Sequence, residues 1–373
     1  MITFSDNIER KPYLGSTEIA EVWLGNIKIY PDNVEPPTPS GYENQYLTFE
    51  ALADDTTFTF TPLNNNVVKY SLDNGRTWVE GNSIQVGNGN KVLVKGELIP
   101  LIDTNNNIYG IGTFSSSANF NVEGNIMSLL FGDNFSGKTD LTGYDYAFEN
   151  LFLHAYNMIN AKNLVLPAKT LSKECYFGMF MNCYRLVTTP KLPATTLAES
   201  CYQTMFNNCE SLVNAPELPA TTLAANCYDI MFKSCTSLTT APELHATTLA
   251  DYCYFGMFSG CTSLVNAQSI LPATTLAEKC YEGMFSGCTS LTTAPELPAI
   301  SLSWHCYWDM FYNCTSLNYI KAMFTITPSS LYTSRWVYNV ASTGTFVKNK
   351  NARWDVTGDD GIPEGWTIET ASV

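Results

Sequence analysis

The stretch Cys227-Tyr-Asp-Ile-Met-Phe-Lys-Ser-Cys-Thr-Ser-Leu-Thr-Thr-Ala-Pro-Glu-Leu-His-Ala-Thr-Thr-Leu-Ala-Asp-Tyr252 is one unit of a tandem repeat that fills roughly half of the chain. Each of six such units carries two cysteines eight residues apart. Consecutive units start 26 residues apart, except for one step of 27, where Gln268-Ser-Ile-Leu271 adds a residue and lacks the usual proline. A degenerate seventh unit precedes them, with Ala147 and Ala155 in the cysteine slots.

Each unit combines two patterns. The apolar residues from Cys253 to Leu264 recur about every fourth position, which predicts a short helix with one apolar face. The Thr- and Pro-rich second half predicts a short extended run and a turn. A unit of this size cannot bury its own apolar face, so we expect residues 146–320 to stack as one solenoid with one short helix in each repeat.

The repeat resembles the leucine-rich repeats of the BspA-like type, in which a Phe-x-x-Cys-x-x-Leu core follows a short strand and turn. The matching pattern Met-Phe-x-x-Cys-x-Ser-Leu begins at Met205, Met231, Met257, Met284 and Met310. Leucine-rich repeats span about 20–29 residues, which agrees with the period of this chain. The resemblance implies a leucine-rich-repeat solenoid of about seven repeats, which we assign to residues 123–320.

The rest of the chain differs in character. Residues 46–122 hold short alternating segments separated by Asn, Gly and Asp, which predicts a small β-sandwich-like domain. Residues 31–45 form a Pro-rich linker, and residues 1–30 hold two similar segments that we expect to form paired strands. Residues 321–373 are expected to cap the last repeat with aromatic side chains. The predicted fold class is therefore α+β and multidomain.

The order of these segments, with Leu14-Gly-Ser-Thr-Glu-Ile19 and Leu24–Tyr30 near the start, resembles virion proteins of crAss-like bacteriophages of gut bacteria. The resemblance implies a structural protein of the head or tail that is present in several copies or as a homo-oligomer. Residues 1–30 would dock on other virion proteins, and the β-domain would act as a spacer. The repeats would then display a surface for a host glycan or protein.

Charge and hydropathy exclude several classes of partner. The chain has 20 Lys and Arg against 35 Asp and Glu, a net charge of −15, and no basic run, which disfavours nucleic acid. It has no apolar segment of the length that spans a membrane. Its first residues lack the pattern of a signal peptide, which favours the virion over the alternative, a BspA-like adhesin of the bacterial cell surface.

Three motifs suggest chemistry, and each has a structural interpretation that we prefer. Gly132-Asp-Asn-Phe-Ser-Gly-Lys-Thr139 matches the phosphate-loop pattern, but Gly143 and the missing strand–helix context favour a turn. Ser71-Leu-Asp-Asn-Gly-Arg-Thr-Trp78 fits the Asp-box of sialidase propellers, where the box is a structural hairpin turn. Asp103-Thr-Asn-Asn-Asn107 lacks the rest of a calcium loop and reads as a hairpin tip. We therefore expect no catalysis, no metal and no cofactor.

The twelve cysteines are predicted to be free, buried thiols. On a helix, the two cysteines of one unit would lie about 12 Å apart. Cysteines of neighbouring units would lie on helix axes roughly 8–10 Å apart, and both separations disfavour a disulfide. The spacing within a unit also differs from that of zinc ligands. Small thiols that fill the interface between repeats are the remaining interpretation.

Positions that vary between units are the candidate recognition sites, because the core positions hardly change. Helical geometry would turn the variable slots beside Cys-Tyr and Met-Phe away from the apolar face. The aromatic residues in those slots are Phe177, Tyr252, Phe255, Trp304, Trp308 and Tyr312. We expect them to be exposed and to favour sugar rings or protein partners, although those in the last unit are also expected to pack against the C-terminal cap.

Overall fold

The computed structural model describes residues 41–371 throughout and, before them, the backbone of residues 2–4, 12–14, 17–18, 22–24 and 27–30. The chain divides into two compact units, Met1–Tyr42 and Glu43–Val373. In the first unit, β1 (Ile2–Phe4), β2 (Pro12–Leu14) and β3 (Thr17–Glu18) form an antiparallel sheet, and β4 (Val22–Leu24) pairs with β5 (Ile27–Tyr30). Each copy of the duplicated segment thus forms paired strands, as predicted. Linker residues 31–40 lie outside the described residues.

The second unit begins with a β-domain of two sheets. After a 3-10 turn, η1 (Tyr42–Asn44), its strands are β6 (Leu47–Ala51), β7 (Thr56–Pro62), β8 (Lys69–Ser71), β9 (Val79–Glu80), β10 (Ser83–Val86), β11 (Lys91–Lys95), β12 (Leu101–Asp103), β13 (Ile108–Gly110), β14 (Gly112–Ser116) and β15 (Phe120–Asn125). One sheet has the order β10-β7-β14, and the other has the order β16-β15-β6-β11-β8-β9, where β16 is Met158–Val165. β12 and β13 form a separate hairpin whose tip is Asp103–Asn107, as predicted.

The two sheets pack face to face through phenylalanines. Phe58 of β7 lies 5.1 Å from Phe49 of β6, and Phe114 of β14 lies 5.0 Å from Phe49 (ring centroids). This contact gives the domain the predicted sandwich-like arrangement. The same core continues into the solenoid, because Phe152 of the first repeat contacts Phe49 and Phe114 at 6.3 and 6.1 Å.

The β-domain is therefore not the separate spacer expected from the sequence. Strand β15 pairs in parallel with β16, which belongs to the first repeat, so the expected boundary after residue 122 lies inside a strand. The Phe114 N–H donates to the Leu151 carbonyl at 2.7 Å. A solenoid needs its open end covered, and here the β-domain covers the N-terminal end.

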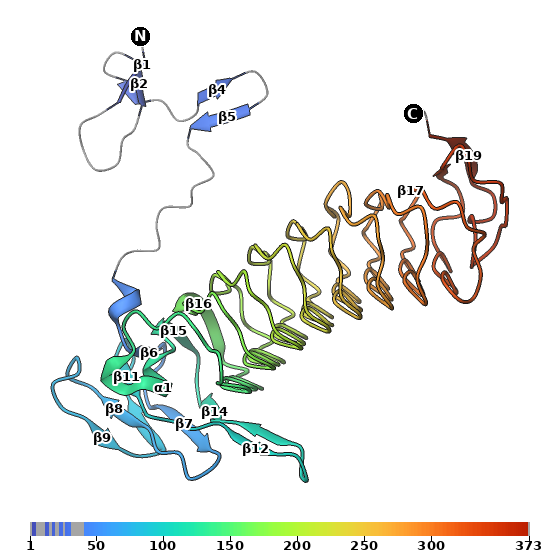
Figure 1. The fold of residues 1–373 in the computed structure, drawn as a ribbon. Helices are drawn as coiled ribbons and strands as arrows, with labels where there is room; N and C mark the ends of the chain where they lie inside the picture. The colour runs from blue at the N-terminus through green and yellow to red at the C-terminus, as the bar shows by residue number, and fades with distance from the viewer. Residues whose placement is uncertain are drawn as a thin grey trace. The chain divides into compact units, whose positions relative to one another are not determined.

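The predicted helix in each repeat is wrong. Within the described residues, α-helix is confined to α1 (Ser128–Phe131), which precedes the repeats and is followed by the 3-10 turn η2 (Gly132–Asn134). The Cys-Tyr…Cys half of each unit is instead a run of turns (Figure 1). The structure is mostly β with few helices, and within the described residues no helix has the length and hydropathy to cross a membrane.

The turns follow a strict alternation of backbone hydrogen bonds. In the unit of Cys175, the N–H groups of Phe177 and Met179 donate three residues back within the unit, to Glu174 and Tyr176. The intervening N–H groups donate to the next unit: Tyr176 to Cys201, Gly178 to Gln203 and Phe180 to Met205. Each coil therefore uses half of its donors to close its own turns and half to hold its neighbour.

This alternation depends on a left-handed backbone at every fourth residue. Glu174, Gly178 and Asn182 have φ values of 50, 57 and 64°, and the same slots repeat in the units that follow. A left-handed residue interrupts the i to i−4 bonds of an α-helix, which explains why no helix forms. Glycine and asparagine favour this conformation, and they recur in these slots.

The core consists of two aromatic ladders, one of tyrosines and one of phenylalanines. The tyrosine ladder stacks Phe148, Tyr176, Tyr202, Tyr228, Tyr254, Tyr281 and Tyr307, with centroids 5.6–6.1 Å apart. The phenylalanine ladder runs from Phe152 to Phe311 with spacings of 5.3–5.8 Å. Trp336 closes the C-terminal end of both, 6.1 Å from Tyr307 and 6.2 Å from Phe311.

The Thr- and Pro-rich halves run side by side as a parallel wall, in agreement with the predicted extended run. Isolated parallel bridges such as Asn214↔Thr240 and Leu218↔Leu244 join the coils there. At the C-terminal end the wall becomes a regular parallel sheet of β17 (Tyr319–Ala322), β18 (Thr345–Lys348) and β19 (Thr367–Thr370). The segment expected to be only a cap therefore also continues the coil, and its Trp336 and Trp354 fill the end of the core.

Candidate functional site

The Cys-Tyr…Cys halves of the units, which form the runs of turns, make up one surface of the solenoid, which we name the turn face. Its side chains come from the residues with a left-handed backbone and from the residues next to them. Because neighbouring coils are in register, equivalent slots form columns along the solenoid. One column contains Tyr252, Lys279 and His305, which have φ values of 57, 51 and 53°. The turn face thereby places side chains from separate repeats within contact distance.

An aromatic–lysine cluster lies on the turn face over the units that begin at Cys253, Cys280 and Cys306. We define it as Tyr252, Phe255, Lys279, Glu282, Trp304, His305 and Trp308. Lys279 Nζ lies 5.1 Å from the ring centroid of Tyr252 and 5.0 Å from that of Trp304, so two rings flank one cation. Trp304 stacks on His305 at 3.8 Å, and Trp308 meets the same imidazole edge-on at 3.9 Å.

The charges in this cluster are partly desolvated. Glu282 Oε2 lies 3.7 Å from both Lys279 Nζ and His305 Nδ1. Burial raises the pKa of the Glu282 carboxyl despite the neighbouring lysine. Burial, with a smaller contribution from the Lys279 charge, lowers the pKa of His305. The lowered pKa of His305 favours the neutral imidazole, which lies beside the Lys279 side chain among aromatic rings.

The structure corrects the expected exposure of Phe177, Tyr252 and Phe255. Trp304 is 44% exposed, but Phe177, Tyr252, Phe255, Trp308 and Tyr312 are partly buried. Because neighbouring coils stack in register, side chains in equivalent slots contact one another, as Tyr252 and Lys279 do, and this contact partly buries them.

Four of the six predicted residues come together, and two do not. Tyr252, Phe255, Trp304 and Trp308 belong to the cluster, with Tyr252 and Phe255 6.0 Å apart. Tyr312 instead stacks on Tyr338 at 5.0 Å within the C-terminal segment, as expected for the last unit. Phe177 occupies the same slot as Phe255 but three units away.

Sequence reasoning missed Lys279, Glu282 and His305 as members of the cluster. The repeat register alone places Lys279 between Tyr252 and His305 in one column, because each directly precedes the first cysteine of its unit. Two further exposed tyrosines, Tyr156 and Tyr184, stack at 5.3 Å near the start of the array and were also missed. They lie directly after the second cysteine slot, a variable position that was not considered among the candidate recognition slots.

A second feature of the turn face is a set of half-buried or buried carboxyl groups. Burial raises the pKa of Asp229 to about 7, although Gln203 Nε2 donates to its Oδ2 at 2.6 Å. Burial, followed by the charge of Glu174, raises the pKa of Glu149 to about 8. Both occupy the slot of Phe177 and Phe255, three residues after a left-handed position, where the neighbouring coils restrict water.

The twelve cysteines are buried in the core, as predicted. The second thiol of each unit has a defined partner: Cys209 Sγ donates to the Phe180 carbonyl of the preceding coil at 3.2 Å, and Cys235 Sγ donates likewise to Phe206. Burial raises the pKa of Cys201 and Cys261 to about 12. Such thiols are inert in the folded protein because the thiolate is disfavoured.

The motifs with possible chemistry are used for structure. Asp133 of the phosphate-loop pattern binds Lys95 Nζ at 2.6 Å and accepts from the Tyr46 hydroxyl at 2.7 Å, and no helix follows Thr139. In the Asp-box, the Gly75 N–H donates to Ser71 Oγ and the Trp78 indole donates to the Gly75 carbonyl, which closes the turn between β8 and β9 as predicted. Within residues 41–371, no group of His, Cys, Asp and Glu is arranged to hold a metal ion.

Comparisons with known proteins give one similar structure. No protein-family model matches the chain, and no curated protein matches it. Among solved structures, the chain is similar to a leucine-rich repeat protein from Bacteroides ovatus ATCC 8483, with 16% sequence identity and a TM-score of 0.36. The match covers 73% of this chain and 66% of that one, so this chain spans slightly less than two thirds of its length.

Proposed function

We propose that this chain is a non-enzymatic attachment protein of a phage virion, whose solenoid displays the aromatic–lysine cluster to a glycan or protein on the host surface. The observation that carries the proposal is the convergence of four variable aromatic residues and Lys279 from three coils. Invariant core slots and a varied surface cluster are the arrangement by which repeat proteins bind partners. The virion, the docking role of residues 1–30 and the presence of several copies rest on the sequence resemblance.

The chemistry of the cluster favours a ligand that combines an apolar face with polar groups. The exposed Trp304 ring offers a flat apolar surface, and rigid aromatic side chains bind at low entropic cost. Lys279 supplies three N–H donors beside that surface. A pyranose ring in a surface polysaccharide has both an apolar face and hydroxyl groups, so a host-surface glycan suits the cluster well.

The chain contains a matched control for this proposal. Phe255 and Phe177 occupy the same slot in the same local sequence, Cys-Tyr-Phe-Gly-Met-Phe, but only Phe255 belongs to the cluster. We expect Phe255→Ser combined with Trp304→Ala to weaken binding of the full chain to host cells about tenfold or more, and Phe177→Ser to leave it unchanged. Unchanged binding by the folded double variant would show that the cluster is not the attachment site.

The presence of the protein in phage particles is tested separately from the role of the aromatic–lysine cluster. Mass spectrometry of purified phage particles is expected to find this chain, and removal of residues 1–30 is expected to prevent its incorporation. The second candidate, a BspA-like adhesin of the bacterial surface, is favoured by the Met-Phe-x-x-Cys-x-Ser-Leu pattern of the repeats. Recovery of the chain from bacterial envelopes, with none in particles, would support that candidate instead.

A further inference from the structure

The 27-residue unit opens a groove in the parallel wall on the other half of the coil. In the regular units, Asn214, Thr240 and Asn266 form a continuous column of bridges, and the column resumes with Thr293↔Tyr319. Within the described residues, no bridge joins Asn266 to Thr293. Pairing returns at Ile270↔Glu296, just beyond the inserted residue. Within the same described residues, the column also lacks a bridge between Thr188 and Asn214 of the regular units, so the groove is marked by its shifted pairing and its lining rather than by the missing bridge alone, and the stacked core beneath it continues.

The backbone N–H groups beside this column are paired in some units and unpaired in others. The Ala241 N–H donates to the Asn266 carbonyl at 3.0 Å, and the Ala294 N–H donates to the Tyr319 carbonyl at 2.9 Å. Among the described residues, the N–H groups of Ala267 and of Ala215 and Thr189 in the same slot have no backbone acceptor, so this slot is unpaired in some units whether or not they carry the insertion. The Gln268 side chain turns back, and its Oε1 accepts from the Leu244 N–H at 2.6 Å. This bond ties the loop with the inserted residue to the preceding coil.

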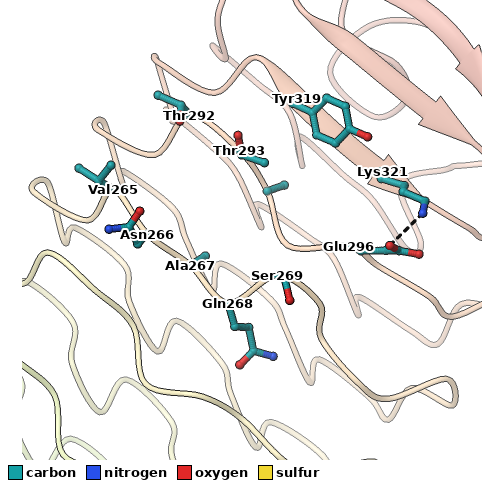
Figure 2. A pocket seen from close by; sticks show the side chains of 11 residues that line it. Val265, Asn266, Ala267, Gln268, Ser269, Thr292, Thr293, Glu296, Tyr319 and Lys321 are labelled. Atoms are coloured by element: carbon teal, nitrogen blue, oxygen red, sulfur yellow. Dashed lines mark hydrogen bonds and ion pairs between the residues drawn. The ribbon is translucent and has the colours of Figure 1, made fainter. Parts of the chain in front are cut away.

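The groove has a volume of about 410 Å³, within the range of roughly 300–1,000 Å³ for small-molecule sites. Figure 2 shows its lining: Asn266 and Ser269 lie on one side, Thr292 and Thr293 between, and Tyr319 with Lys321 on the far side. Lys321 Nζ is neutralised by Glu296 Oε2 at 2.9 Å. The lining thus provides hydroxyls, an amide, one ring and an ion pair with no net charge.

We propose that this groove binds a neutral saccharide. Sugar hydroxyls both donate and accept, and the groove offers both functions through Asn266, Thr293 and the Tyr319 hydroxyl. The Ala267 N–H adds a fixed backbone donor. An anionic ligand is disfavoured because the one cation is already paired and the chain carries a net charge of −15. The proposal does not depend on the aromatic–lysine cluster, which is formed by the other half of the coil.

The test compares the full chain with a variant that restores the regular repeat. Gln268→Pro with deletion of Ser269 gives a 26-residue unit, which is expected to pair with its neighbours and close the groove. The probes are an array of neutral mannan, glucan and galactan fragments, with polygalacturonate fragments as charged controls. We expect the wild-type chain to bind a neutral fragment and the shortened variant to lose at least about tenfold in affinity.

Point variants keep the test independent of the shortened chain's folding. Thr293→Val and Tyr319→Phe remove one hydroxyl each and are expected to weaken binding severalfold, whereas Thr240→Val alters the same slot in a closed part of the wall and is expected to have no effect. Binding to none of the neutral fragments would overturn the proposal, as would full binding by the closed variant. Phe255→Ser with Trp304→Ala is expected to leave this binding intact, so failure of one site is distinguishable from failure of the other.

Discussion

Replacement of Gly283 by alanine distinguishes the observed stack of turns from the helix that the sequence suggests. Gly283 occupies a left-handed slot with φ of 61°, and its N–H donates to the Trp308 carbonyl of the next coil at 2.7 Å. A Cβ atom built at this position meets no other atom within 4 Å. Any loss of stability in Gly283→Ala therefore comes from the backbone conformation rather than from a steric clash.

A helix and a stack of turns predict changes of opposite sign in the free energy of unfolding when Gly283 is replaced by alanine. In a helix interior, alanine would stabilise the protein by about 1 kcal/mol over glycine. In a left-handed slot, alanine costs about 1–2 kcal/mol, and its lower entropy in the unfolded chain offsets about 0.4–1 kcal/mol of that cost. We therefore expect Gly283→Ala to lower the free energy of unfolding by about 1 kcal/mol.

Urea unfolding followed by tyrosine fluorescence measures this difference. Gly283→Asn is expected to lose less than Gly283→Ala, because asparagine tolerates the left-handed region and occupies equivalent slots at Asn182 and Asn313. Gly41→Ala is the control, since Gly41 also has open space around its Cβ position but no positive φ. A Gly283→Ala protein as stable as the wild type, or more stable, would refute the stack of turns.

Three further predictions follow from the core and the buried carboxyl groups. Thiol titration without reductant should count twelve free thiols in denaturant and almost none in the native protein, because every cysteine is buried; a markedly lower count in denaturant would reveal disulfides. The pKa of Asp229 is raised from 3.8 to about 7 in the folded state, so the protonated carboxyl stabilises the fold at low pH. The wild type should therefore lose at most about 4 kcal/mol of folding free energy as the pH rises from about 4 to 7. Asp229→Asn should flatten this part of the stability–pH profile, and an unchanged profile would show that Asp229 titrates normally. Trp336→Ala removes the fully buried ring that closes both aromatic ladders, together with the hydrogen bond from its indole N–H to the Gly361 carbonyl. It should lower the free energy of unfolding in urea by about 3–5 kcal/mol. A loss below about 1 kcal/mol would mean that the C-terminal cap does not stabilise the repeat array.

The sequence was sufficient to predict the solenoid because the repeat period and the apolar slots are written into it directly. It did not reveal the turns, since Cys175, Met179 and Cys183 at intervals of four fit a short helix almost as well as a run of four-residue turns. The deciding signal was the recurrence of Gly and Asn at Gly178, Asn182 and their equivalents, which favours a left-handed backbone. The contact between β15 and β16 joins distant segments and left no local pattern to predict it.

The candidate site was predicted only in part, because the pattern of each repeat predicts a helix where the structure has turns. Variation between units identified Tyr252, Phe255 and Trp304, but a helical period assigned their directions and so overestimated the exposure of Tyr252 and Phe255, whereas Trp304 is exposed. Lys279 and His305 occupy the same variable slot as Tyr252, but neither is an apolar aromatic residue of the kind that the sequence suggested for recognition. The groove at Gln268 was visible only as an irregular spacing, because its lining comes from three coils that are distant in the sequence.

Attachment through the aromatic–lysine cluster is tested most directly by oxidative footprinting of the full chain while it is bound to host cells. Trp304 and Tyr252 should become protected on binding, because a ligand would cover the 44% of Trp304 that is exposed in the free protein. The exposed pair Tyr156 and Tyr184 serves as an internal reference and should be oxidised equally in both states. Unchanged oxidation of Trp304 in the bound chain, or protection confined to Tyr156 and Tyr184, would contradict attachment through the cluster.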